Sequence, residues 1–62
     1  MELEFKNWFV SVKEEAIEHF GYTETEVSNF SQKNWIDFFD QGLTPFEAVM
    51  QYLKKVFKHQ NG

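Results

Sequence analysis

Twelve aromatic side chains, spread over most of a 62-residue chain, limit what this sequence can fold into. The chain has no cysteine, so no disulfide can stabilise it. A chain of this length buries only about 60% of the surface exposed when unfolded, and one aromatic ring buries about 150–250 Å². The core must therefore consist of a few large rings, in a single helical domain over residues 1–62.

Residues 3–20 contain neither glycine nor proline and carry an apolar residue at every third or fourth position. An α-helix turns 100° per residue, so these side chains share one face about 120° wide. Gly21 follows and can adopt the left-handed conformation that ends many helices. The side chains of the predicted core face are Phe5, Trp8, Phe9, Val12, Ala16 and Phe20.

The middle of the chain predicts a short helix followed by a longer one. Thr23 and Glu26 form a capping box, which starts a helix over about residues 24–29. A second helix follows over residues 31–41, and Gly42 can end it. Ser28, Asn29 and Ser31 interrupt the pattern between them, although one continuous helix over 24–40 is an open alternative.

The clearest helix start lies at Thr44, with Pro45 in the first turn and Glu47 completing a second capping box. The helix that follows is expected to fray from His59 onward. Its apolar stripe is Phe46, Val49, Met50, Leu53, Val56 and Phe57, and Ala48 and Tyr52 fall to one side of that stripe.

These elements predict an all-α fold, a compact three-helix bundle with an additional short helix between the first and second long helices. The faces expected to meet place eight side chains in one core. They are Phe9, Val12, Trp35, Phe38, Phe39, Val49, Leu53 and Phe57.

The charge balance narrows the possible partners. Ten acidic residues against six lysines and no arginine give a net charge of −4. Binding to nucleic acid or to an anionic membrane relies on a positive field, so neither is expected here. The chain shows neither a leader peptide nor an apolar run long enough to span a bilayer, and with no cysteine this favours a cytoplasmic protein.

No catalytic or metal-binding pattern emerges from the sequence. His19 follows Glu15 by one helical turn, which is typical of a surface histidine near a helix C-terminus. Nucleophilic catalysis needs a serine or cysteine beside a base, and the serines here fall on a charged face or in caps. We expect a protein that is not an enzyme and that has no cofactor, no metal and no small-molecule substrate.

Residues 48–62 are basic, because all ten acids lie within residues 2–47. Lys54, Lys55 and Lys58 form a candidate basic tip, which either complements the helix dipole or contacts a phosphate or an acidic partner. In an alternative interpretation, residues 32–58 form a helix-turn-helix-like pair of a nucleic-acid-linked regulator, although that pair offers no arginine.

A second apolar set on the first helix has no evident place in the core. Leu3, Val10 and Ile17 recur every seven residues, more than 100° from the main face, and Tyr52 is a similar surplus on the last helix. Unpartnered apolar surface of this kind is typical of an interface. We therefore expect these four residues to contact a protein partner or a second copy of the chain.

Residues 35–48 resemble a segment that recurs in short, uncharacterised helical proteins of bacteria, phages and plasmids. The shared pattern is an aromatic helix, a glycine, and then Thr-Pro-x-Glu-Ala, present here as Thr44 to Ala48. The resemblance implies an accessory protein of a phage or mobile element that modulates a host or phage protein. It implies no site residues.

Overall fold

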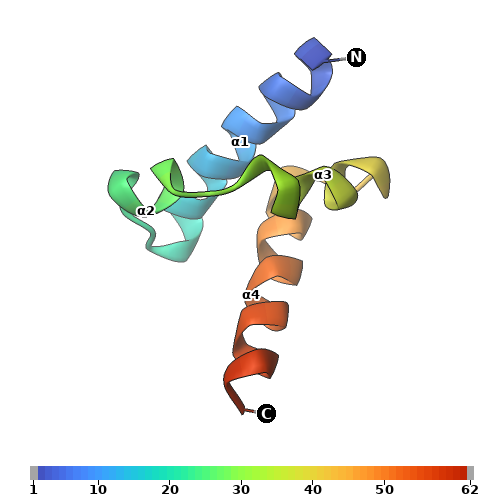
Figure 1. The fold of residues 1–62 in the computed structure, drawn as a ribbon. Coiled ribbons are helices and arrows are strands. Elements are labelled where there is room, and N and C mark those ends of the chain that lie inside the picture. The colour runs from blue at the N-terminus through green and yellow to red at the C-terminus, as the bar shows by residue number, and fades with distance from the viewer. Residues whose placement is uncertain (1, 62) are drawn as a thin grey trace.

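Four helices, bounded largely by the start and stop signals of the sequence, make up the fold of the computed structural model (Figure 1). They are α1 (Glu2–Phe20), α2 (Glu24–Ser28), α3 (Gln32–Asp40) and α4 (Pro45–Asn61). The structure describes the backbone of residues 2–61 and the side chains of residues 4–56. That part of the chain contains no strand, so the predicted all-α fold with a short helix between the first two long ones is confirmed.

The helix ends follow from glycine geometry. Gly21 and Gly42 adopt φ values of +75° and +82°, a region in which a residue with a Cβ is strained. At the end of α3, the Gly42 amide donates to the carbonyl oxygen of Phe39 at 3.0 Å, and the Leu43 amide donates to that of Phe38 at 3.2 Å. These two bonds satisfy carbonyl groups that have no partner within the helix.

The helix starts follow from the two capping boxes. The Thr23 amide donates to the Glu26 carboxylate at 2.8 Å, and the Thr44 amide donates to the Glu47 carboxylate at 3.0 Å. In each box the glutamate amide donates in return to the threonine hydroxyl at 3.2 Å. Residues 29–31 separate α2 from α3, so the alternative of one helix over 24–40 is wrong.

Trp35 is the centre of the core and is fully buried. Rings from three other parts of the chain surround it, with centroid distances of 4.6 Å to Tyr52, 5.0 Å to Phe30 and 6.4 Å to Phe9. Phe38, one turn along α3, meets it edge-on at 5.8 Å. The other buried residues are Val12, Ala16, Val27, Ala48 and Val49.

The predicted core is largely confirmed. Phe9, Val12, Trp35 and Val49 are buried, and Phe38 and Leu53 are partly buried and packed against the buried cluster. Phe39 is also partly buried, but it meets Phe5 and Trp8 edge-on, each at a centroid distance of 5.4 Å. The side chain of Phe57 lies outside the described residues.

The orientation of α4 differs from the prediction. Ala48, expected beside the apolar stripe, is fully buried, and Tyr52 stacks on Trp35, so the expectation that both lie outside the core is wrong. Phe46 and Met50, expected in the stripe, are instead each 43% exposed. Ala48 and Ala16 lie in one buried cluster, on the helix pair that packs most extensively. Small residues at such a position let two helices approach closely. This favours the observed rotation of α4 about its own axis, which turns Ala48 toward the core.

A side-chain hydrogen bond links α1 to the segment between α3 and α4. The indole Nε1 of Trp8 in α1 donates to the carbonyl oxygen of Leu43, immediately before α4, at 2.9 Å. Beyond this anchored start, α4 extends away from the other three helices (Figure 1). Its backbone stays helical through Asn61, so the expected fraying from His59 is not observed.

Thr44→Ala tests the capping of α4. The substitution removes the hydroxyl that accepts the Glu47 amide, while Thr44 is itself exposed, so no core packing is lost. We expect the free energy of unfolding to fall by about 0.5–2 kcal/mol. Urea unfolding monitored by circular dichroism measures this change, and Thr25→Ala, an exposed threonine without a cap role, is the control. Equal stability of the two variants would contradict the assigned cap.

Candidate functional site

The outer side of α1 carries uncovered apolar side chains. Val10 is 49% exposed and Ile17 is 37% exposed. Glu14, also exposed, lies between them, four residues after Val10 and three before Ile17. At that spacing the three residues line one side of the helix. We name Val10, Glu14 and Ile17 the outer strip; Leu3, predicted to extend it, has its side chain outside the described residues.

The basic side chains near Glu14, the acid of the outer strip, contact other groups instead. The Lys13 ammonium lies 4.8 Å from the centroid of the Phe9 ring and is therefore engaged by that aromatic face. His19 pairs with Glu15, with 3.5 Å between Nε2 and Oε1, and this is the one ion pair among the side chains that the structure describes. Glu14 therefore presents an unpaired carboxylate between two aliphatic side chains.

Tyr52, the fourth predicted interface residue, does not join the outer strip. Its ring stacks on Trp35 at a centroid distance of 4.6 Å and contacts Phe30 at 5.8 Å. It is partly buried and packs against the core. The structure therefore leaves Val10 and Ile17 together on one surface and places Tyr52 elsewhere.

A second exposed apolar surface, which the sequence reasoning missed, lies on α4. Phe46 and Met50 are one turn apart, and Phe46 also contacts the ring of Phe20 at 5.2 Å. The rotation of α4 exposes both. Ala48 is the residue that could have predicted this orientation, because an alanine among large apolar residues indicates that another helix crosses closely on the side of the alanine.

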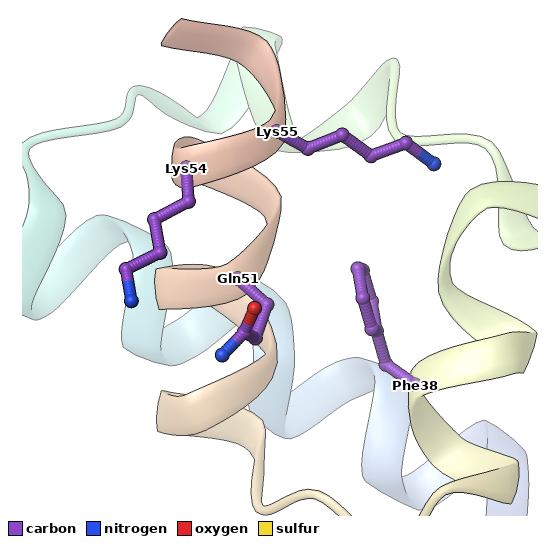
Figure 2. A pocket seen from close by; sticks show the side chains of 4 residues that line it. All are labelled: Phe38, Gln51, Lys54 and Lys55. Atoms are coloured by element: carbon purple, nitrogen blue, oxygen red, sulfur yellow. The ribbon is translucent and has the colours of Figure 1, made fainter. Parts of the chain in front are cut away.

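A hollow of about 370 Å³ lies between α3 and α4. It is lined by Phe38 from α3 and by Gln51, Lys54 and Lys55 from α4. Figure 2 shows the Phe38 ring projecting from α3 and the Lys55 side chain extending from α4 toward the same space. Lys55 of the predicted basic tip thus extends toward the space beside an aromatic ring, whereas the Lys54 ammonium points away from that ring (Figure 2). The side chain of Lys58 lies outside the described residues.

The two lysines of the hollow have no ion-pair partner among the carboxylates that the structure describes. Both are exposed, whereas Phe38 is partly buried. The hollow therefore combines an apolar wall with the ammonium group of Lys55 (Figure 2). A ligand that matches it carries a carboxylate or another anionic group next to an apolar group.

Tyr22 has a pKa that differs from its ordinary value. Partial burial, and then the nearby Tyr52 hydroxyl and Glu26 carboxylate, raise the pKa of Tyr22 above its ordinary value of 10.0. The phenol therefore stays neutral at neutral pH and offers no base. The buried indole Nε1 of Trp35 has no hydrogen-bond partner, but an indole does not titrate in this range.

Among the described residues, no three side chains of His, Asp or Glu gather as metal ligands would. In the same part of the chain, no helix combines the length and the apolarity that crossing a membrane requires. The expectations of no metal, no cofactor and no catalytic activity stay predictions. No protein-family model, curated protein or solved structure matches the chain.

Proposed function

We propose that this protein is not an enzyme and acts by binding another protein chain through the outer strip of α1. The observation that carries the proposal is the exposure of Val10 and Ile17 on one side of a helix whose other side is committed to the core. Covering them removes apolar area from water at about 25 cal/mol per Å². The carboxylate of Glu14 between them would orient the partner and select against acidic surfaces.

The alternative, a nucleic-acid-linked regulator, has weaker support. The helix pair that it requires exists as α3 and α4, joined by residues 41–44, and Lys54 and Lys55 are exposed on α4. However, the chain has a net charge of −4 and no arginine, which disfavours binding to a polyanion. Protein binding therefore remains the preferred function.

The resemblance of residues 35–48 to segments of phage and plasmid proteins supports a partner from a phage or its host. It is the basis on which we propose that the protein is an accessory protein of a mobile element. We also propose a cytoplasmic location, which is supported by the lack of cysteine and of an apolar run long enough to span a bilayer.

The double variant Val10→Asp/Ile17→Asp tests the outer strip. Two charges on the strip should reduce the capture of partner chains, whether host proteins or further copies, by about tenfold or more, because each carboxylate would have to be desolvated on binding. Pull-down from a host lysate measures the capture of host proteins, and sedimentation of the purified protein measures self-association.

The matched control for this test is Thr25→Asp/Gln32→Asp, which adds the same charge at exposed polar positions outside α1. Thermal unfolding should show that both double variants remain folded. Unchanged capture and unchanged mass for the folded Val10→Asp/Ile17→Asp protein would refute a role of the outer strip in binding.

A further inference from the structure

The outer strip of α1 and the hollow between α3 and α4 are complementary in charge and in apolar character. The strip offers a carboxylate, Glu14, between two aliphatic side chains. The hollow offers the Phe38 ring on the side toward which the Lys55 ammonium extends (Figure 2). We propose that the outer strip docks into the hollow of a second copy of the chain, an inference that names the partner and rests on the proposed function.

The unpaired charges favour this pairing. Neither Glu14 nor Lys55 has an ion-pair partner among the described side chains of its own copy. The ten acids lie within residues 2–47, and five of them, including Glu14, are in α1. Two acidic molecules therefore attract one another only where the basic part of α4 in one copy meets α1 in the other.

The dimensions of the two surfaces are compatible. Val10 and Ile17 are seven residues apart, which is about 10 Å along a helix, with Glu14 between them. In the hollow, Gln51 and Lys55 are one turn apart on α4, and Phe38 faces them from α3 (Figure 2). In the proposed docking Glu14 lies at the Lys55 ammonium, and the aliphatic side chains that flank Glu14 are the groups available to cover the Phe38 ring.

The size of the chain also favours self-association. A 62-residue fold without disulfides has a small core, and such folds are often stabilised by oligomerisation. Strip and hollow are different surfaces, so one pair of copies can make the contact twice about a twofold axis. In that arrangement each copy covers the apolar strip of the other.

Single charge reversals, measured by sedimentation of the purified full chain at several concentrations and two salt concentrations, test the docking. The wild-type mass should rise above that of one copy, 7.5 kDa, as concentration increases, and should fall with added salt. Lys55→Glu and Glu14→Lys should each weaken association about tenfold or more. An equimolar mixture of the two variants should restore association, because the reversed charges attract one another.

Lys33→Glu and Glu4→Lys are the matched controls. Each is an exposed position outside both surfaces and gives the same net charge as its counterpart, and each should associate like the wild type. Far-UV circular dichroism checks that every variant is folded. Association that survives both test reversals, or a mixture that stays monomeric, overturns the docking, as does association that only Phe46→Asp on α4 abolishes.

A monomeric wild type at all concentrations also overturns the inference, and it separates the inference from the proposed function. If Val10→Asp/Ile17→Asp still loses a captured host protein, the strip binds a different chain and the proposed function stands. If capture is unchanged as well, both proposals fail.

Discussion

Trp35→Ala is expected to abolish cooperative unfolding of the domain at ordinary temperatures. Trp35 is fully buried, and its ring lies within 4.6–6.4 Å of the ring centroids of Phe9, Phe30, Phe38 and Tyr52. Truncating a buried tryptophan to alanine costs about 3–5 kcal/mol. At about 0.05–0.15 kcal/mol per residue, a domain of this length has only about 3–9 kcal/mol of stability.

Thermal unfolding monitored by circular dichroism measures the loss, with Phe46→Ala as the control. Phe46 is also aromatic, but it is 43% exposed, so its truncation should cost much less. Trp35→Phe should be milder than Trp35→Ala, because it keeps a ring in the core and removes a buried N–H that has no acceptor. A sharp transition near the wild-type temperature for Trp35→Ala would show that this ring is not the centre of the core.

The helix boundaries were predictable because local chemistry determines them. A threonine and a glutamate three residues later satisfy the free amides of a first turn wherever the helix lies in the fold. A glycine after the last turn likewise supplies a left-handed residue without tertiary help. Thr44 and Gly42 were therefore assigned correctly, although neither contributes to the buried core.

The rotation of α4 and the hollow beside it could not be predicted in this way. The apolar side chains of α4 cover more of the helix surface than a single packed face can bury. The neighbouring helices decide which of them are buried. The buried position of Ala48 depends on how closely α1 crosses, and the hollow depends on the angle between α3 and α4. By contrast, the exposure of Val10 and Ile17 was predictable, because the core face of α1 was already filled by other residues.

Ala48→Leu separates the observed orientation of α4 from the one that the sequence predicted. Ala48 is fully buried in the cluster that also contains Ala16 and Val12, so the larger side chain must displace its neighbours. Overpacking of this kind costs about 1–3 kcal/mol, and in a domain of this size each kcal/mol lowers the melting temperature by about 4–8 °C. The near-ultraviolet circular dichroism of the stacked Trp35 and Tyr52 should change as well, since Tyr52 lies one turn further along α4.

Met50→Leu and Met50→Asp complete the test on the same helix. Met50 is 43% exposed, so the isosteric change and the charged one should each alter stability by only about 0.5 kcal/mol. In the orientation that the sequence predicted, Met50 would lie in the core and Ala48 beside it. Met50→Asp would then be the more destabilising substitution and Ala48→Leu the less destabilising one. A harmless Ala48→Leu together with a severely destabilised Met50→Asp would therefore show that α4 packs through its large apolar stripe, and that the surfaces assigned to α4 are misplaced.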